Sequence, residues 1–495
     1  MTPLLLLIIL SLLLFTYFLS PLLTPNPLPG PLYARLTSLV LKYHEFTATR
    51  TAYIHTLHLR YGPVVRVAPN EVAFASAAAV KEIYCSNGSG YDKTEWYDLF
   101  KVYDRRTMFT TLGKSEHAKR KRVLADRYAN SNIMKGGIME GIKERARTFR
   151  DLCEKRGKEA VDLYVILHAY AFDCVTLHLF HPHSTNSLTD PKDSEIMLEV
   201  TFDSSLQNRL LSHYSPLLHK LLNSFLSHIL HLKPRETPLA DNFVLNTALQ
   251  TATFPFTLLH RLHHDLPPSA SASLDQTDKA AECLDHMAAG IDTTGDALCF
   301  LIWELSQPSS MQYQRRLQEE LRRPADDNTP IEKLPYLDAV VMEGLRMFPA
   351  IPMSLPRYCP KEGRKIDGYE IPGGTIVSCQ AYSVQRLGHG GVFPEPERFW
   401  AERWLRSEGE TQEEFEERDR ERRRHFFAFS QGGRGCIGKH LALAEMKCLL
   451  REVYSRFTTL PDPGMRVEEM EMADLLVSSR PAGQRCLVRF EKLES

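Results

Sequence analysis

The apolar residues of the chain gather first in one long N-terminal stretch. Between residues 4 and 19 almost every residue is Leu, Ile or Phe, and no charged residue or histidine precedes Arg35. Extended to Leu23, the stretch has a length close to the roughly 20 residues that cross the apolar core of a bilayer. We therefore predict a transmembrane anchor over residues 1–24. A cleaved secretory signal is the alternative, but the basic start and small-residue cleavage site of such signals are missing.

A proline-rich segment and then a basic one follow this stretch. Five prolines surround Gly30 between residues 21 and 31, so a helix cannot continue there, and residues 25–34 are expected to form a stiff spacer. Arg35, Lys42 and Arg50 come next. Because positive charge flanks the apolar stretch only on its C-terminal side, the positive-inside tendency predicts a single-pass anchor with residues 35–495 in the cytosol.

Beyond the spacer the apolar pattern predicts a mainly α domain with minor β structure. Residues 115 to about 262 have apolar positions at mostly helical spacing. Residues 63–68 and 71–74 predict a hairpin, and Ser76 is expected to cap the helix after it. Later strands are expected only in three segments bounded by Gly or Pro, namely 365–371, 375–379 and 486–490.

Two further segments are expected to be irregular. Residues 265–275 contain two prolines and alternate Ser with Ala, which is typical of a loop. Residues 407–424 are dominated by acidic and basic side chains, and we interpret them as a solvated insertion without a binding role.

Charge and cysteine content narrow the class of protein. The 60 Lys and Arg and 61 Asp and Glu residues give a net charge of -1, which leaves no overall field to attract nucleic acid. We therefore expect no nucleic-acid partner. The ten cysteines are too sparse for a disulfide scaffold and form no CxxC pair. This pattern indicates a reducing compartment, in agreement with a cytosolic domain.

One cysteine stands in a distinctive setting near the C-terminus. Cys436 follows a glycine-rich loop and precedes a segment of good helix formers that begins at Lys439. Backbone amides at a helix N-terminus and the nearby Arg434 both favour the thiolate, which is the form that binds metal. The flanking glycines permit a tight loop whose backbone can approach a flat ligand.

The spacing of this segment, Phe429-x-x-Gly-x-Arg434-x-Cys436-x-Gly438, resembles the heme-binding signature of the cytochrome P-450 superfamily. The resemblance implies heme b as the cofactor, with Cys436 as the axial thiolate on the iron, which favours cleavage of dioxygen. It further implies that Phe429 packs near the sulfur, that Arg434 meets a heme propionate and that Gly438 belongs to the same cofactor-binding loop.

Other motifs of this superfamily occur in the expected order. Glu343 and Arg346 resemble its Glu-x-x-Arg helix, and the segment from Phe399 to Trp404 resembles the one that supplies the second arginine of a structural triad. We assign that role to Arg403 and not to Arg398, because Phe399 and Trp404 frame Arg403.

The remaining matches concern oxygen chemistry and the heme carboxylates. The segment from Ala289 to Thr294 resembles the helix that crosses the distal heme face, with Asp292 and Thr293 as an acid-alcohol pair and Gly290 leaving room for oxygen and substrate. The positions implied to bind the propionates are Arg357, His117 and Lys121, the last two replacing the more frequent Trp and Arg.

The resemblance thus implies one cytochrome P-450-type heme domain tethered to the endoplasmic reticulum membrane, with monooxygenation of an apolar small molecule as its activity. Electrons from NADPH are expected through a separate NADPH-cytochrome P-450 reductase, with O2 as co-substrate. The chain as a whole looks most like the fungal biosynthetic members of the superfamily, which suggests that its substrate is a terpenoid or a polyketide. Residues 91–111 and 351–355 are expected to shape the substrate pocket.

Two other functions are compatible with the same motifs. Some relatives rearrange or dehydrate an oxygenated substrate without a reductase, although they often depart from the acid-alcohol pair that Asp292 and Thr293 form here. A non-catalytic membrane heme sensor with the same thiolate is the second alternative.

Overall fold

The structure is a computed structural model, and it covers most of the chain after the spacer. It describes residues 28–494 except 158, 226–228, 230, 267–273, 323–329 and 388–390, and before residue 28 only Leu5, Ser11 and Phe15. Apart from these three residues, the predicted anchor over residues 1–24 lies outside the described residues, as does most of the predicted loop over 265–275.

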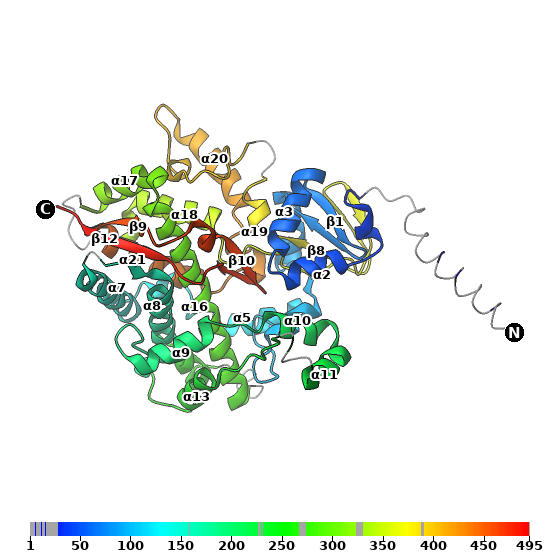
Figure 1. The fold of residues 1–495 in the computed structure, drawn as a ribbon, viewed down its shortest axis with the longest axis horizontal. Helices are drawn as coiled ribbons and strands as arrows, with labels where there is room; N and C mark the ends of the chain where they lie inside the picture. Colours follow the sequence, from blue (N-terminus) through cyan, green and yellow to red (C-terminus); the bar gives the residue numbers. More distant parts are fainter. Residues whose placement is uncertain are drawn as a thin grey trace.

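Two long helices, α8 (Leu163–Phe180) and α16 (Gln276–Ser306), pack along each other at the centre of the helical region (Figure 1). Among the described helices, α8 is long and apolar enough to cross a membrane, but 89% of it is buried inside the domain, so it is a core helix. α16 starts with a capping box in which Asp275 and Asp278 accept each other's backbone N–H. It continues past Gly290 without a break.

The other helices surround this pair and connect it to the sheets. Those in the N-terminal half fill most of the described part of residues 115–262, as the apolar spacing predicts. The helices are α2 (Leu39–Phe46), α3 (Arg50–Tyr61), α4 (Ala77–Val80), α5 (Lys114–Leu124), α6 (Asn130–Ile133), α7 (Gly136–Arg156), α9 (Pro191–Thr201), α10 (Leu206–Tyr214), α11 (Pro216–Phe225), α13 (Pro238–Thr247), α14 (Leu258–His264), α17 (Met311–Arg322), α18 (Pro335–Met347), α19 (Ala381–Val384), α20 (Gln412–His425) and α21 (Lys439–Tyr454).

The predicted N-terminal hairpin is confirmed. β1 (Val64–Ala68) and β2 (Glu71–Phe74) pair antiparallel, and the Ser76 side chain accepts the backbone N–H of Ala79 to cap α4. These strands lie at the end of the domain that carries the N-terminal residues (Figure 1).

The hairpin belongs to a five-stranded sheet that combines both halves of the chain. Its order is β1-β2-β8-β5-β3, with β8 (Ile376–Cys379) parallel to β2. β5 (Arg357–Tyr358) and β3 (Asp92–Lys93) complete the sheet as an antiparallel pair. The sheet therefore brings residues near position 93 against residues near position 357.

The prediction for the later strands is partly wrong. Residues 365–371 do not form one strand but a hairpin of β6 (Arg364–Ile366) and β7 (Tyr369–Ile371). The chain reverses between them because Asp367 and Gly368 have positive φ values of 47° and 84°. Predicted strands are found at 375–379 and 486–490, as β8 and β12 (Leu487–Lys492).

Three other strands near the C-terminus were not predicted from the sequence. β9 (Phe457–Pro461) lies beside β12, which also pairs with β4 (Val161–Asp162), while β10 (Met472–Leu475) and β11 (Ser478–Pro481) form a separate hairpin. No Gly or Pro separates β9 from the end of α21, so the usual boundary signal is missing.

The charged segment 407–424 is mostly the helix α20, whose outer side is exposed as predicted. Its inner side is attached to the domain. Arg418 Nη1 donates to the carbonyl of Arg403 at 2.8 Å, and Arg422 Nη1 donates to the same carbonyl. The segment is thus a docked helix and not only a solvated insertion.

Candidate functional site

Cys436 lies in a tight loop between a short 3-10 turn, Gly432–Arg434, and the N-terminus of α21. The Cys436 N–H donates to the Phe429 carbonyl at 2.8 Å, which closes the loop. Gly432 has a φ of +72°, and a Cβ there would collide with the Tyr84 carbonyl, so only glycine fits. Gly438 is the N-cap residue of α21.

Cys436 differs from the other nine cysteines because its side chain is exposed, whereas Cys85 is half-buried and the remaining eight are buried. Protein atoms around the sulfur still raise the pKa of the Cys436 thiol, mainly because they reduce the hydration of the thiolate. The Gly438 and Lys439 amides and the Lys121 and Lys439 ammonium groups oppose that effect. The helix amides therefore act on the sulfur as the sequence predicts.

The charged residues around the loop are arranged differently from the sequence expectation. Lys121 and Lys439 are the cations with the largest effect on the Cys436 pKa, whereas Arg434 Nη2 donates to the Leu112 carbonyl at 2.7 Å. Lys121 Nζ donates to the carbonyls of Gly433 and Gly435 at 3.0 and 2.6 Å, so it holds the loop itself. Phe429 is partly buried, with Lys439 Nζ 5.8 Å from its ring centroid.

A group of basic side chains gathers beside this loop, and we call it the basic cluster. It contains the three predicted propionate ligands, Arg434 and one residue that the sequence analysis did not select. These are Lys93, His117, Lys121, Arg357 and Arg434. All except the half-buried Lys121 are buried.

The basic cluster is poor in compensating acids. Arg434 is 8% exposed, and its Nε and Nη1 find no hydrogen-bond partner among the described residues. Its nearest carboxylate is that of the exposed Asp92, 3.7 Å from Nη2. Arg357 Nη1 donates to the Tyr97 hydroxyl at 2.6 Å. Burial and the neighbouring cations lower the pKa of His117 to about 3, so its ring is neutral at neutral pH.

Glu343, Arg346 and Arg403 form a second buried group, the carboxylate triad. All three side chains are 0–1% exposed. Arg346 donates through Nε and Nη2 to the two Glu343 oxygens at 2.9 and 3.0 Å, and Arg403 Nε donates to Oε1 at 3.0 Å. The Trp400 N–H and Trp404 Nε1 complete the carboxylate's partners. The triad joins α18 to the segment around Trp404.

The alternative arginine for this triad is placed elsewhere. Arg398 is exposed and pairs with Glu395 at 3.3 Å. The structure thus brings Arg403, and not Arg398, against Glu343.

Asp292 and Thr293 lie side by side near the middle of α16, and both are half-buried. Burial raises the pKa of Asp292 to about 7, although Arg235 and Arg480 partly oppose this. One Asp292 oxygen is buried and accepts no hydrogen bond within the described part of the chain. Thr293 Oγ1 donates to the Ala289 carbonyl one turn earlier at 2.7 Å.

The expectation that Gly290 leaves room for oxygen and substrate is wrong. A Cβ at this position would lie 2.6 Å from Cγ2 of Val175 on α8. Gly290 therefore permits close packing of α16 on α8, and Val175 fills the space beside it.

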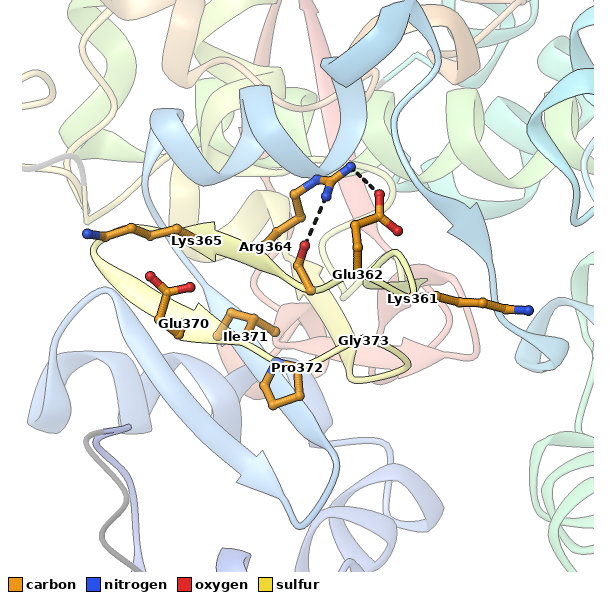
Figure 2. Close-up of a pocket in the computed structure, with 9 residues that line it drawn as sticks. Lys361, Glu362, Arg364, Lys365, Glu370, Ile371, Pro372 and Gly373 are labelled. Atoms are coloured by element: carbon orange, nitrogen blue, oxygen red, sulfur yellow. Dashed lines mark hydrogen bonds and ion pairs between the residues drawn. The ribbon is translucent and has the colours of Figure 1, made fainter.

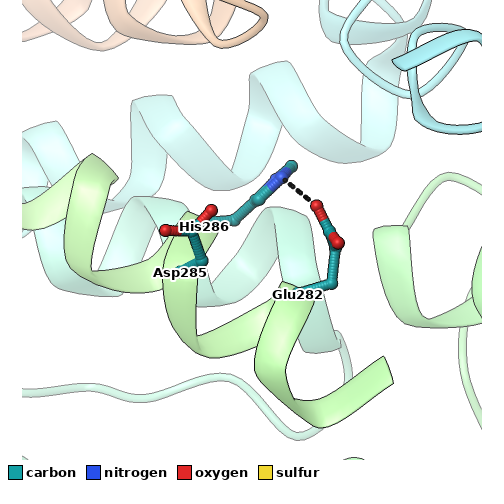
Figure 3. Close-up of side chains that lie close together, drawn as sticks. All are labelled: Glu282, Asp285 and His286. Atoms are coloured by element: carbon teal, nitrogen blue, oxygen red, sulfur yellow. Dashed lines mark ion pairs between the residues drawn. The ribbon is translucent and has the colours of Figure 1, made fainter. Parts of the chain in front are cut away.

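Three titratable residues precede Asp292 on α16 and were missed in the sequence. Glu282, Asp285 and His286 bring one ligand atom each within 4.8 Å of one another (Figure 3). Their spacing of three and four residues on a helix is the signal that could have revealed them.

Two of these residues already have partners on other elements. The Glu282 carboxylate accepts the Met108 N–H at 2.9 Å and lies 3.6 Å from Arg120, while His286 Nδ1 lies 2.5 Å from the Tyr128 hydroxyl. We interpret the group as a polar connection from α16 to residues 107–128. Residues 91–111, expected to shape a substrate pocket, thus also form fixed contacts with α16.

A surface pocket of about 520 Å³ lies along the β6–β7 hairpin (Figure 2). Two of its charged groups pair with each other, since Arg364 Nη2 lies 2.6 Å from Glu362 Oε1, and Arg364 Nη1 also donates to the Gly363 carbonyl. Neither Cys436 nor the α16 residues line this pocket. This pocket therefore lies apart from the predicted site residues. We take Cys436 and the basic cluster as the candidate site, because an exposed thiol lies there beside buried basic side chains.

Comparison with known proteins agrees with this assignment. The sequence profile of the cytochrome P-450 family matches residues 27–487. Cytochrome P-450 monooxygenase orf2 of Aspergillus niger is 27% identical over 94% of this chain and 93% of its own length. Cytochrome P-450 monooxygenase cypX of Dothistroma septosporum is 27% identical over 96% and 92%, and stcB of Emericella nidulans is 27% identical over 93% and 87%.

The chain belongs to the cytochrome P-450 family, and the relatives named above are monooxygenases. The cofactor is accordingly heme with an axial cysteine thiolate. The residues present fit that group, because Cys436 is exposed and Arg434 offers two buried nitrogens, Nε and Nη1, that no described residue pairs and that can donate to a carboxylate. Cys436 would hold the iron, and Arg434 and Arg357 would hold the carboxylates.

Proposed function

We propose that this protein inserts one oxygen atom of O2 into an apolar small molecule, with electrons from NADPH delivered by a separate cytochrome P-450 reductase. When bound, the heme supplies the activation of dioxygen. The observation that carries the proposal is the Asp292–Thr293 pair on α16, a proton-exchanging acid next to a hydroxyl. Oxygen insertion needs protons as well as electrons, and this pair can supply them.

Asp292 is suited to handle protons near neutral pH. A carboxyl whose pKa lies near the working pH can both release and regain a proton. Arg235, Arg480 and Asp203 act on it electrostatically, so its environment contains charges that can adjust its protonation. The Thr293 hydroxyl can donate and accept hydrogen bonds, which allows it to pass a proton onward.

The test replaces Thr293 with Val, which keeps the β-branched shape and removes the hydroxyl. We expect unchanged folding and heme content, about a tenfold fall in product per NADPH consumed, and release of peroxide or water in its place. Thr277→Val, in the first turn of the same helix, is the matched control and should retain normal coupling. Normal coupling in Thr293→Val would reject this role.

The pH dependence of coupling tests Asp292 separately. A donor with a pKa of about 7 is protonated below that pH, so product per NADPH should decline as the pH rises through 7. Asp292→Asn should turn over more slowly and lose this pH step. A wild-type profile in the Asn variant would contradict the assignment.

The two alternative functions predict different cofactor requirements. An isomerase or dehydratase would convert its substrate without NADPH or reductase. A heme sensor would convert no substrate although it binds heme normally. Untargeted product analysis in a host that co-expresses a reductase, with and without this chain, distinguishes all three outcomes.

The substrate proposal rests on the relatives. Those named above are monooxygenases of fungi, and the likeness extends over nearly the whole chain. We place this enzyme in fungal secondary metabolism, with a terpenoid or polyketide as substrate. The same product analysis identifies the compound.

We also propose that residues 1–24 anchor the protein in the endoplasmic reticulum membrane, with the spacer over 25–34 and the catalytic domain over 35–495 on the cytosolic side. The apolar, uncharged composition of residues 1–24 supports this. α11 adds support because Leu217 and Leu221 are 79% and 74% exposed, as in helices that lie in the membrane interface.

Deletion of residues 1–24 tests the anchor. The truncated protein should move from the membrane fraction toward the soluble one and keep its heme. Some truncated protein can remain in the membrane fraction. If Leu217→Ser and Leu221→Ser abolish this residual attachment, α11 makes a second contact with membrane lipid. A truncated protein that still resists alkaline extraction would show that the single-anchor proposal is wrong.

A further inference from the structure

Lys93 is a buried basic residue that none of the recognised motifs contains. Its side chain is 4% exposed, and Nζ donates to the Phe109 carbonyl at 2.5 Å. Nζ also lies 4.4 and 4.5 Å from the ring centroids of Tyr97 and Phe109. An ammonium group carries three N–H donors, and one carbonyl occupies only one of them. Among the described residues no carboxylate lies within ion-pair distance, so Lys93 retains capacity for an anion.

The position of Lys93 in the sheet places it among other cations. The antiparallel register of β3 and β5 sets Lys93 directly opposite Arg357, which is itself 2% exposed. Like charges in facing positions destabilise a strand pair. The backbone N–H of Lys93 and Nη2 of Arg434 also share the Leu112 carbonyl, at 3.1 and 2.7 Å. Three cationic side chains therefore converge on one small region.

The acids nearby are too few to balance this charge. Asp285 of α16 and Asp92 are the carboxylates that act on Lys93 and Arg434, and Asp92 is exposed. Burial and the neighbouring Arg357 and Arg434 accordingly lower the pKa of Lys93 well below its ordinary value, and an anion beside it would favour its charged form. The region is therefore complementary to a ligand that brings carboxylates from outside the chain.

We infer that Lys93 binds a carboxylate of the heme, as a third cationic contact beside Arg357 and Arg434. The inference rests on the heme that family membership implies and is independent of the proposed substrate chemistry. Lys93 lies 28 positions before Lys121 in the sequence and outside the loop of Cys436, so it ties the N-terminal part of the sheet to the cofactor.

The rate of heme release tests the inference without any activity measurement. Heme is transferred from the purified holoenzyme to an excess of apomyoglobin. Lys93→Met should release heme about tenfold faster than the wild type, the loss expected for one charge-assisted hydrogen bond. Lys93→Arg should stay close to the wild type. Lys119→Met, an exposed lysine on α5, is the matched control and should not change the rate.

A heme without free carboxylates separates ligand binding from a structural role. With iron protoporphyrin IX dimethyl ester, the wild type should release the cofactor faster than it releases heme, and Lys93→Met should cause no further acceleration. The same acceleration by Lys93→Met with heme and with the ester would assign Lys93 a structural role. A Lys93→Met variant that releases heme at the wild-type rate would overturn the inference. If Lys93→Met does not fold, the wild type and Lys93→Arg still permit the ester comparison, and equal release of ester and heme would overturn the inference.

Discussion

The carboxylate triad and the basic cluster are both built from buried charges, but only the triad is complete. In the triad, Arg346 and Arg403 share Glu343, whose two oxygens accept five hydrogen bonds. In the basic cluster, Lys93 stands opposite Arg357, and two Arg434 nitrogens find no partner within the described residues. The difference indicates that the triad stabilises the fold by itself, whereas the basic cluster requires an anionic ligand.

The largest expected effect comes from making the triad incomplete. Glu343→Ala leaves two buried guanidinium groups without a counter-charge, which should cost about 3–5 kcal/mol of unfolding free energy with or without heme. Chemical denaturation measures the loss. Glu140→Ala removes the partner of Lys143 in a surface ion pair and should leave stability unchanged. A stable Glu343→Ala protein would remove the distinction between the two groups.

Removing a charge from the basic cluster should not lower the stability of the heme-free protein, in contrast to the removal of Glu343. Arg434→Leu deletes a buried guanidinium with unpaired nitrogens, so the heme-free chain should be as stable as the wild type or more stable by about 1 kcal/mol. The holoenzyme should release heme about tenfold faster. Denaturation of the heme-free form and heme transfer from the holoenzyme provide the two values. Strong destabilisation of the heme-free form would make Arg434 a structural residue like Arg346.

The smallest effect concerns the titration of His117. Burial and the adjacent cations lower its pKa to about 3 in the folded chain, below the ordinary 6.5 of the unfolded one. The unfolded state therefore binds the proton first, and stability is lost as the pH falls below 6.5. Between pH 6.5 and 5.5 the heme-free wild type should lose about 1 kcal/mol more than His117→Gln. His231→Gln, which replaces an exposed histidine outside the cluster, is the control for the loss of a histidine side chain. Parallel profiles for His117→Gln and the wild type would show that the cluster does not suppress protonation.

Local sequence signals predicted the parts of the fold and site that depend on neighbouring residues. The β1–β2 hairpin and the Ser76 cap follow from turn and capping chemistry within a few residues. The setting of Cys436 before α21 is likewise local. These features need no knowledge of the tertiary structure.

The features that were missed depend on contacts between distant segments. Lys93 lies opposite Arg357 only because β3 pairs with β5, and these strands lie far apart in the chain. Gly290 looked like space for a ligand because the sequence does not show that Val175 of α8 packs against it. β9 was missed because no turn residue separates it from α21.

The ferrous carbon-monoxide spectrum tests the central claim, that Cys436 supplies the thiolate of the site beside the basic cluster. Cys436→Ala should lose the thiolate-type spectrum, because neither alanine nor a nearby carbonyl supplies an anionic sulfur. Cys448→Ala, which removes a buried cysteine of α21, should keep it. A thiolate-type spectrum that persists in Cys436→Ala would contradict the assignment of this cysteine and of the site built around it.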